Sequence, residues 1–269
     1  FVILVVVTED LYMLAVERRS KIEQIITQNK SVLVPELAKQ FEVTTETIRG
    51  DLEKLEKKGV LVRTYGGATL VEGSEADMDY SDRAAVNAEG KQRIGERAAE
   101  MIKDGETIFL DASTSSLYVA KYIKEKQGLT VITNAERVVQ ELAGCPNIKV
   151  ICIGGGLHPK NMSYCGRIAE ETIRNYYYAN KLFFSCRGAT ILRGLTESSE
   201  EEAEIKKAML ERCETSVFLC DYKKIGKLGI PIISDLKSVD TFITDIKLTE
   251  EWHTVLEEND VEVLEVPAE

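Results

Sequence analysis

An apolar segment of the chain is followed by small hydroxyl residues in a pattern that suits phosphate binding. The run 108–110 is followed by Asp111, and then by Ser113, Thr114 and Ser115 at the start of a helical stretch. Hydroxyls and backbone N–H groups in the first turn of a helix bind anions. The same residue types also serve as ordinary helix caps. The pattern taken alone leaves both interpretations open.

Other strand-like segments end in residues that suit the same chemistry. They follow the segments 130–133, 149–153 and 215–220, and they are Asn134, Gly155, Asp221 and Lys224. Glycine lets a ligand approach the backbone closely, and lysine is a partner for an anion. Taken together, these residues predict one small anionic ligand, either a phosphate or a sugar acid. The sequence contains neither the dinucleotide pattern G-x-G-x-x-G nor a Walker phosphate loop.

Histidine and cysteine are too sparse and too scattered for catalysis or metal binding. The chain has two histidines and six cysteines, and no two cysteines form a C-x-x-C pair. A Ser-His-Asp triad, a zinc site and a disulfide framework are therefore not expected. We expect reduced, mostly buried thiols in a cytoplasmic protein, with no metal and no cofactor.

The larger, C-terminal part of the chain alternates between strand-like and helix-like segments. Apolar runs predict strands at 107–111, 130–133, 149–153, 181–185, 215–220, 240–244 and 261–266. Helices are predicted at 116–126, 135–143, 168–178, 200–213 and 249–258. This alternation predicts an α/β fold, with a parallel sheet covered by helices on both faces. Ligands of such sheets bind beyond the carboxyl ends of the strands, where the polar residues above lie.

The N-terminal part of the chain shows short helices followed by a hairpin. Apolar residues at helical spacing predict helices at 17–28, 34–41 and 44–58, and they are followed by a predicted strand at 60–65 and a turn at 66–67. Two helices joined by a short turn and followed by a two-stranded wing form a winged helix-turn-helix. This motif places its second helix in the major groove of DNA.

The outer face of the third predicted helix carries residue types that contact DNA. The candidates are Thr44, Thr45, Thr47 and Arg49 on that helix, and Arg63 and Tyr65 on the wing. Hydroxyls bind phosphates and base edges, and arginine adds a cation. A small helical bundle with a solvated polar face has the same spacing, so spacing alone leaves that alternative open.

Charge is distributed unevenly along the chain of 269 residues, whose net charge is −11. Residues 13–70 carry ten basic and eight acidic side chains, a net charge of +2, whereas residues 71–269 carry 24 basic and 35 acidic side chains, a net charge of −11. Such asymmetry indicates different partners for the two parts. The total charge therefore does not argue against nucleic acid as a partner of the first part.

The composition of successive segments predicts the domain boundaries. We predict an extension of unknown role at 1–12, a DNA-binding domain at 13–70, an acidic linker region at 71–90 and a ligand-binding domain at 91–269. The longest apolar run, 1–7, is far shorter than the about 20 residues that span a bilayer. No basic residue precedes it, so we expect neither a membrane partner nor a signal peptide.

The third predicted helix and the wing resemble the DNA-binding domain of DeoR-type bacterial transcriptional repressors. The resemblance rests on residues 44–59 and 61–68. In that family serine usually stands at the position of Thr44, and a second arginine at the position of Gly50. Threonine keeps the helix cap. Glycine removes a phosphate contact and lowers the stability of the helix by about 1 kcal/mol relative to alanine.

The resemblance continues through most of the chain, to about residue 250. The matching residues are Arg83, Asn87, Lys91, the segment 111–115 at the family's Asp-x-Gly-Thr-Thr, Thr133, Asn134, Gly154, Gly155, Gly194, Thr196, Asp221, Lys224, Thr244 and Asp245. The resemblance implies that the second domain shares the fold of sugar-phosphate isomerases and CoA transferases and senses a phosphorylated sugar. It implies that Ser113, Thr114 and Ser115 hold the phosphate, that Asn134, Gly155 and Lys224 complete the pocket, and that Asp111 and Asp221 shape it or bind hydroxyls.

This resemblance implies a DNA-binding repressor of a carbohydrate-use operon. Its expected partners are operator DNA, a phosphorylated sugar and at least one further copy of the chain. The alternative is a sugar-phosphate isomerase with an added helical domain, in which Asp111 or Asp221 is the base and Lys224 stabilises developing charge. The N-terminal wing favours the regulator, since an isomerase has no use for it.

Overall fold

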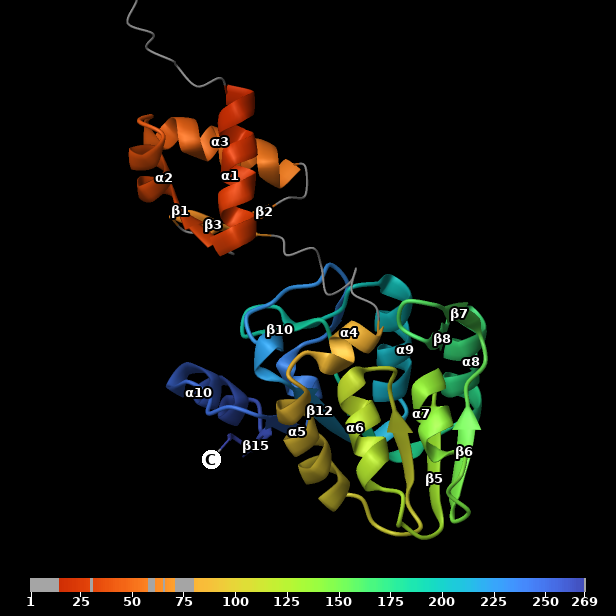
Figure 1. Cartoon of the computed structure of the whole chain (residues 1–269). Coiled ribbons are helices and arrows are strands. Elements are labelled where there is room, and N and C mark those ends of the chain that lie inside the picture. Colours follow the sequence, from red (N-terminus) through yellow and green to blue (C-terminus); the bar gives the residue numbers. More distant parts are fainter. Residues whose placement is uncertain (1–14, 30, 58–60, 65, 71–79, 269) are drawn as a thin grey trace, which may run out of the picture. The chain divides into compact units, whose positions relative to one another are not determined.

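The chain forms two compact units in the computed structural model, residues 1–74 and residues 75–269 (Figure 1). The structure describes residues 15–29, 31–57, 61–64, 66–70 and 80–268. Within those residues, no helix is long and apolar enough to cross a membrane. The predicted extension at 1–12 lies outside the described residues, as does Tyr65.

The first unit contains the predicted helices and a wing. Its elements are α1 (Ala15–Asn29), β1 (Ser31–Leu33), α2 (Val34–Gln40), α3 (Thr45–Lys57), β2 (Leu61–Thr64) and β3 (Gly67–Leu70). The helices pack through a buried cluster that includes Ile22, Leu37, Ile48, Leu52 and Leu55. The predicted stripe of α3 is thus the face that it buries. The helix-turn-helix arrangement of α2 and α3 is confirmed.

The wing has one strand more than predicted. The strands pair antiparallel in the order β1-β3-β2, with Val32 opposite Ala68. A side chain at Gly67 would lie 2.2 Å from the carbonyl oxygen of Val32, so glycine is required where β1 meets β3. The prediction missed β1 because three residues are too short to show an alternating pattern.

The second unit is built on a parallel sheet of seven strands. Its strands are β4 (Thr107–Leu110), β5 (Leu129–Thr133), β6 (Ile148–Cys152), β9 (Ala179–Phe184), β12 (Cys213–Cys220), β14 (Thr241–Thr244) and β15 (Glu262–Glu265). They are ordered β15-β14-β12-β9-β4-β5-β6, and the neighbours pair in parallel. This sheet confirms the predicted α/β fold, because each predicted strand is present.

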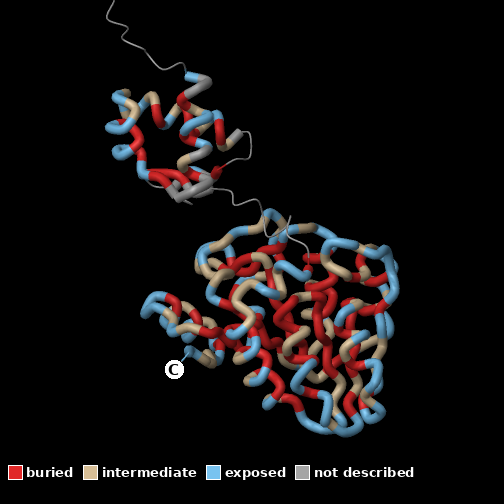
Figure 2. Tube along the Cα trace, in the orientation of Figure 1, coloured by how far each residue is buried: buried red, intermediate tan, exposed pale blue. Residues whose placement is uncertain are grey.

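Helices cover both faces of this sheet. On one face lie α5 (Ala88–Glu100), α6 (Thr114–Tyr122) and α7 (Glu136–Leu142). On the other face lie α8 (Arg167–Tyr176), α9 (Glu200–Leu210) and α10 (Glu250–Glu258). Buried residues run along the sheet and the inner sides of these helices, and exposed residues cover the outside (Figure 2).

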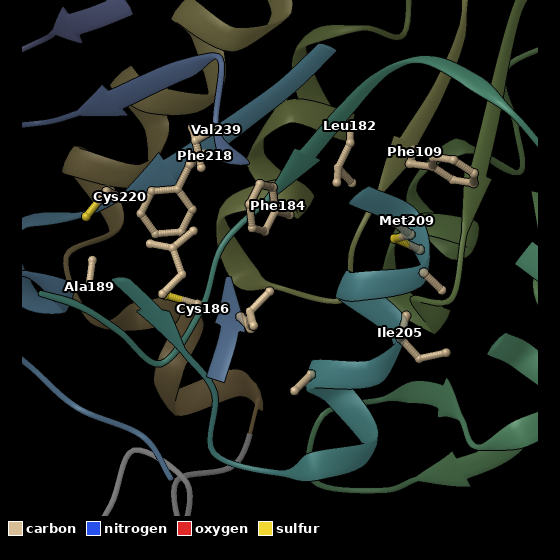
Figure 3. Close-up of a cluster of buried hydrophobic side chains, with 14 of the residues drawn as sticks. Phe109, Leu182, Phe184, Cys186, Ala189, Ile205, Met209, Phe218, Cys220 and Val239 are labelled. Atoms are coloured by element: carbon tan, nitrogen blue, oxygen red, sulfur yellow. The ribbon is translucent and has the colours of Figure 1, made fainter. Parts of the chain in front are cut away.

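Aromatic side chains organise the core between the sheet and α8, α9 and α10 (Figure 3). The ring centroids of Phe184 and Phe218 lie 5.3 Å apart, as do those of Phe218 and Phe242. Trp252 of α10 continues the row, 5.8 Å from Phe242. Tilted contacts of this kind contribute about 0.5–1.5 kcal/mol each beyond the area that they bury. The row fixes β9, β12 and β14 beneath the site described below.

The direction of chain progression across the sheet reverses between β4 and β9. From β4 the chain moves outward through β5 and β6, and from β9 it moves the other way through β12, β14 and β15. Such a switch point leaves a crevice beyond the carboxyl ends of the two central strands. The residues that follow β4 and β9, beginning with Asp111 and Ser185, are therefore positioned to form a site.

Several shorter elements, absent from the sequence-based prediction, surround this crevice. They are α4 (Tyr80–Ala85), β7 (Gly156–His158), β8 (Ser163–Cys165), β10 (Gly188–Thr190), β11 (Gly194–Thr196), β13 (Ile232–Ser234) and the 3-10 helices η1 (Tyr222–Lys224) and η2 (Leu236–Ser238). Strands β10, β11 and β13 form a separate antiparallel sheet. Residues 80–90, which the sequence assigns to a linker, form α4 and the start of α5 within the second unit.

Candidate functional site

A cavity lies at the switch point of the second unit. It is lined by Arg83, Ala112, Ser113, Thr114, Asn161, Ser185, Cys186, Arg187, Glu197, Ser198, Glu202, Lys206 and Lys224. It encloses about 500 Å³, including the solvent at its mouth. The lining comes from the segments after β4, β9, β11 and β12, from α4 and α9, and from the loop before β8. This is the place where an open parallel sheet binds its ligands.

One wall of the cavity is the first turn of α6. The Oγ of Ser113 accepts a hydrogen bond from the backbone N–H of Ser116 at 3.1 Å, so Ser113 is the cap of this helix. Thr114 follows as the first helical residue, and the positive end of the helix dipole faces the cavity rim. Lys224, at the end of η1, adds a cationic side chain to the lining. Three predicted residues, Ser113, Thr114 and Lys224, thus share one cavity.

Asp111 lies directly beneath this wall and is almost fully buried. One of its carboxylate oxygens accepts hydrogen bonds from the N–H of Ser113 at 3.1 Å and from the hydroxyl of Ser116 at 2.5 Å. The other accepts from the N–H of Ser185 at 3.1 Å and faces the Lys206 Nζ at 3.4 Å. Asp111 therefore joins the ends of β4 and β9 and fixes the loop that carries Ser113.

The opposite wall contains a buried lysine surrounded by carboxylates. The Nζ of Lys206 lies 3.0 Å from Glu197, 3.4 Å from Asp111 and 3.7 Å from Glu202, and the Lys206 side chain is 5% exposed. Glu202 also accepts hydrogen bonds from Asn161 at 2.9 Å and from the hydroxyl of Ser163. One cation and three carboxylates thus form a buried network that continues into the cavity.

Electrostatics keep Lys206 and Glu202 ionised despite their burial. Burial opposes the charged form of Lys206, but the charges of Glu197, Asp111 and Glu202 outweigh it and hold the pKa of Lys206 well above its usual value. Burial likewise opposes ionisation of Glu202. The charge of Lys206 and the hydrogen bonds from Ser163 and Asn161 prevail, so the pKa of Glu202 is lowered. Both groups are therefore charged at neutral pH.

Besides Asp111, four predicted effector residues lie outside the cavity lining: Ser115, Asn134, Gly155 and Asp221. The Oγ of Ser115, the Oδ1 of Asn134 and the Oδ2 of Asp221 are buried and have no hydrogen-bond partner among the described residues. An unpaired buried polar atom raises the free energy of the folded state by about 1–3 kcal/mol. A side chain at Gly155 would lie 2.6 Å from the carbonyl oxygen of Cys165, so Gly155 allows close packing against β8.

Sequence reasoning missed the acidic and basic residues on and near α9. Glu197, Glu202 and Lys206 line the cavity, although charged residues in a helix are usually solvated. A signal was present: Glu202, Ile205, Lys206 and Met209 have the spacing of one buried helical stripe. Arg83 also lines the cavity and had been noted only as part of the resemblance.

The predicted DNA-contacting residues of α3 come together at its N-terminus. The Oγ1 of Thr44 accepts a hydrogen bond from the N–H of Thr47 at 3.2 Å, which confirms Thr44 as the cap. The hydroxyl of Thr45 donates to the carboxylate of Glu46 at 3.2 Å. Arg49 is 61% exposed and lies 3.2 Å from Glu46. These side chains form a polar surface of the kind that contacts phosphates and base edges.

The wing residue Arg63 is held near the other end of α3. Its Nε lies 2.7 Å from a carboxylate oxygen of Glu56, and its backbone N–H donates to the second oxygen at 2.9 Å. Glu56 comes seven residues after Arg49, which is about 10 Å along a helix axis. The basic residues Arg18 and Arg19, by contrast, turn inward and pair with the buried Asp51 at 2.6 and 3.1 Å.

The two units together define a class of protein: a DNA-binding helix-turn-helix domain followed by an α/β domain that carries a polar cavity. Residues 18–73 match the family model described as "DeoR-like helix-turn-helix domain", and residues 86–246 match the one described as "DeoR C terminal sensor domain". The chain belongs to the DeoR family of transcriptional regulators. The resemblance noted in the sequence is thereby confirmed.

Curated relatives match over nearly their whole length. The chain is 40% identical to the uncharacterized HTH-type transcriptional regulator YulB of Bacillus subtilis, covering 95% of this chain and 98% of the relative. It is 30% identical to the putative aga operon transcriptional repressor of Escherichia coli O157:H7, covering 85% and 86%. It is 31% identical to the L-fucose operon activator of Haemophilus influenzae, covering 91% and 97%.

Solved structures with a similar course of the chain are distant in sequence. The δ subunit of eIF2B from Chaetomium thermophilum aligns with a TM-score of 0.46 and 14% identity, over 87% of this chain and 72% of that one. Ribose 5-phosphate isomerase A from Methanocaldococcus jannaschii aligns with a TM-score of 0.38 and 13% identity, over 52% and 55%.

Proposed function

We propose that the chain represses a carbohydrate-use operon and responds to a phosphorylated sugar bound in the switch-point cavity. The observation that supports this most directly is the division of the cavity into two kinds of wall. The first turn of α6, with Ser113 and Thr114, and the cation of Lys224 suit a phosphate. Glu197 and Asn161 on the other side suit the hydroxyls of a sugar.

The predicted effector residues take different roles in this proposal. Ser113, Thr114 and Lys224 contact the phosphate, and Asp111 fixes the loop that presents them. The unpaired buried atoms of Ser115, Asn134 and Asp221 support a place for them beside the ligand. Gly155 acts through packing.

Operator binding is assigned to the first unit. The N-terminal turn of α3 enters the major groove, where Thr44, Thr45, Thr47 and Arg49 contact phosphates and bases. Arg63 and Tyr65 of the wing contact the DNA backbone or the minor groove. An operator with two half-sites requires at least a homodimer. Because its operator DNA lies in the cytoplasm, the protein acts there. One relative is named an activator and another a repressor. The experiment below therefore also measures whether the sugar phosphate strengthens or weakens operator binding.

A binding titration tests this proposal. DNA from upstream of the encoding gene is titrated with the protein by fluorescence anisotropy at low salt, with and without glucose 6-phosphate, fructose 6-phosphate and ribose 5-phosphate. We expect the anisotropy to rise on binding, and the affinity to change by about 5- to 150-fold with one of these sugars. Absence of binding to any upstream fragment, or no response to any sugar phosphate, overturns the proposal.

The enzyme alternative is opposed by the geometry of its two candidate bases, Asp111 and Asp221, of which Asp221 lies outside the cavity lining. Asp111 accepts three hydrogen bonds and faces Lys206, so both of its oxygens are occupied within the fold. A general base needs an oxygen within reach of the substrate proton. We therefore propose that the chain is not an enzyme. Turnover of any of the three sugar phosphates by the purified protein contradicts this.

A further inference from the structure

The short helix α4 connects the cavity to the chain that leads in from the DNA-binding unit. It is the first described element after residues 71–79, which follow that unit in the sequence. Arg83, in the last turn of α4, lines the cavity together with Lys224 of η1. A residue that lines the cavity thus lies only a few positions after the end of the connecting segment, residues 71–79. This placement suggests a route by which binding acts on the connection.

The N-terminal end of α4 is anchored in the same region. Tyr80 is 6% exposed, and α4 packs against α6, whose first turn forms the cavity wall. Burial and the nearby charge of Asp111 raise the pKa of Tyr80. Its hydroxyl has no hydrogen-bond partner among the described residues. Arg83 lies over the Tyr80 ring, with its guanidinium carbon 5.7 Å from the ring centroid. Tyr80 therefore packs beneath Arg83, the residue of α4 that lines the cavity.

The junction between α4 and α5 is fixed by buried side chains. The Nζ of Lys91 donates to the carbonyl oxygens of Arg83 at 2.6 Å and of Val86 at 2.8 Å, so it holds the C-terminal end of α4. Asn87 adopts the left-handed conformation at φ 54°, which asparagine tolerates better than most residues. Its Nδ2 donates to the Oδ2 of Asp245 at 2.8 Å. The junction is thereby tied to the segment after β14.

Asp245 completes a bridge that returns to the cavity. Its second oxygen, Oδ1, accepts a hydrogen bond from the backbone N–H of Tyr222 at 2.7 Å. Tyr222 begins η1, and η1 ends at the cavity residue Lys224. A side chain at Gly90 would lie 2.1 Å from the Oδ2 of Asp245, so the close approach of α5 to this carboxylate requires glycine. Two of the cationic residues that line the cavity, Arg83 and Lys224, therefore stand at opposite ends of one part-buried bridge.

We propose that the Asn87–Asp245 bridge transmits occupancy of the cavity to α4, and through α4 to the segment that leads to the DNA-binding domain. An anion that contacts both Arg83 and Lys224 favours the arrangement in which η1 and α4 are held together. In the other arrangement η1 and α4 are apart, and only one of the two cations reaches the anion. A ligand shifts the equilibrium between the two arrangements only by its different affinity for them. Asn87 is a positioning residue that does not line the cavity. This inference rests on the proposed sugar-phosphate effector.

The test compares hydrogen exchange in the full-length protein with and without a sugar phosphate. The probe is whichever of glucose 6-phosphate, fructose 6-phosphate and ribose 5-phosphate raises the thermal midpoint most. In the unaltered protein we expect the probe to slow exchange at residues 111–118 and also at 80–91, the latter by about 5- to 150-fold. Asn87→Gly keeps the left-handed backbone and removes the amide. It should retain protection at 111–118 and lose it at 80–91.

Exchanging the amide of Asn87 and the carboxylate of Asp245 tests whether the response can be restored. Asn87→Asp places two carboxylates together and should also abolish the response at 80–91. The double variant Asn87→Asp with Asp245→Asn restores one amide and one carboxylate across the bridge, and an amide oxygen remains for the N–H of Tyr222, so the response should return.

The outcomes separate this inference from the function on which it rests. If no probe raises the thermal midpoint, the proposed effector is wrong and this inference falls with it. If a probe protects 111–118 but leaves 80–91 unchanged, or if Asn87→Gly responds like the unaltered protein, only the bridge is overturned. Failure of the double variant to recover, when it binds the probe as tightly as the unaltered protein, also overturns the bridge.

Discussion

The two units of this protein use charged side chains in opposite ways. In the DNA-binding unit, Arg49 and Arg63 are exposed, and each pairs with a carboxylate that is also solvent-accessible. In the sensor unit, Lys206 is 5% exposed and is enclosed by Glu197, Glu202 and Asp111. An exposed pair contributes little to stability, whereas removal of one partner of a buried set leaves uncompensated charge. The fold of the sensor unit and its site therefore depend on the same residues, while those of the DNA-binding unit are separable.

The largest loss of stability is expected for Lys206→Met. The substitution keeps the length of the side chain but leaves three buried carboxylates without their cation. We expect the sensor unit to lose about 3–5 kcal/mol in its free energy of unfolding, measured by urea denaturation at neutral pH. The neighbouring Lys207→Met is the control, because Lys207 is 36% exposed and pairs only with Glu204 among the ion pairs described. It should change stability by no more than about 0.5 kcal/mol. Equal effects of the two substitutions would contradict the greater importance of buried charges for stability, on which the comparison rests.

Acid should weaken the same network. Folding lowers the pKa of Glu202 below its ordinary value of 4.5, against the effect of burial and because of Lys206, Ser163 and Asn161. A lowered pKa in the folded state contributes stability that is present above pH 4.5 and is lost as the pH falls through the folded-state value. Urea denaturation over this acidic range should show stability falling more steeply in the unaltered protein than in Glu202→Gln. Parallel pH profiles would contradict a role for the Glu202 charge.

One buried carboxylate in the DNA-binding unit, which pairs with two arginines, is a counter-example within the comparison. Asp51 of α3 pairs with Arg18 and Arg19 of α1, and its side chain is 4% exposed. Asp51→Asn removes the charge but leaves one acceptor, so we expect a loss of about 3 kcal/mol confined to this unit. Hydrogen exchange should accelerate in α1 and α3 while the seven-stranded sheet keeps its protection. Glu46→Gln, which removes an exposed carboxylate from the same helix, is the control and should leave exchange unchanged.

The sequence predicts the central sheet well for a physical reason. Parallel strands are buried on both faces, so they stand out as apolar runs such as 107–111 and 215–220. Helix α5 was not predicted because it packs through small residues: Gly90, Gly95, Ala98 and Ala99 are buried, and Ile94 is its one large apolar residue that is buried. A side chain at Gly95 would lie 2.7 Å from Tyr118, so the close packing that removes the apolar pattern is itself required.

The candidate site was predictable only where it follows the strand ends. Ser113, Thr114 and Lys224 were found because residues beyond parallel strands converge. Lys206 and Glu202 were missed because a Glu–Lys pair four residues apart is usually a solvated pair on a helix surface. Their burial depends on α9 packing against the sheet beside Asp111, a contact between distant parts of the sequence. Pairings of this kind are set by the tertiary fold.

Among the exposed charges, Arg49 is expected to matter for DNA binding but not for stability, and Arg49→Ala tests this. Arg49 lies at the N-terminal end of α3 and its charge is accessible. We expect the free energy of operator binding to weaken by about 1–3 kcal/mol. The slope of log affinity against log salt concentration should become shallower by about 1, the value for one phosphate contact. The free energy of unfolding should change by less than about 0.5 kcal/mol. Lys237→Ala removes an equally exposed charge from the sensor unit and should leave DNA affinity unchanged. A loss of folding in Arg49→Ala would show that surface charge on α3 is structural.

The sharpest test of an independent DNA-binding surface is expected at Gly50. It lies in the interior of α3, and an added side chain would have no atom within 4 Å among the described residues. Gly50→Ala should therefore stabilise the unit by about 1 kcal/mol through helix propensity alone. Gly50→Arg should give most of that stabilisation and also place a second cation beside Arg49, which strengthens operator binding and steepens its dependence on salt. The matched pair isolates the charge from the helix propensity. If Gly50→Arg stabilises the helix as Gly50→Ala does but leaves DNA affinity and its salt slope unchanged, this face of α3 does not lie against the phosphates.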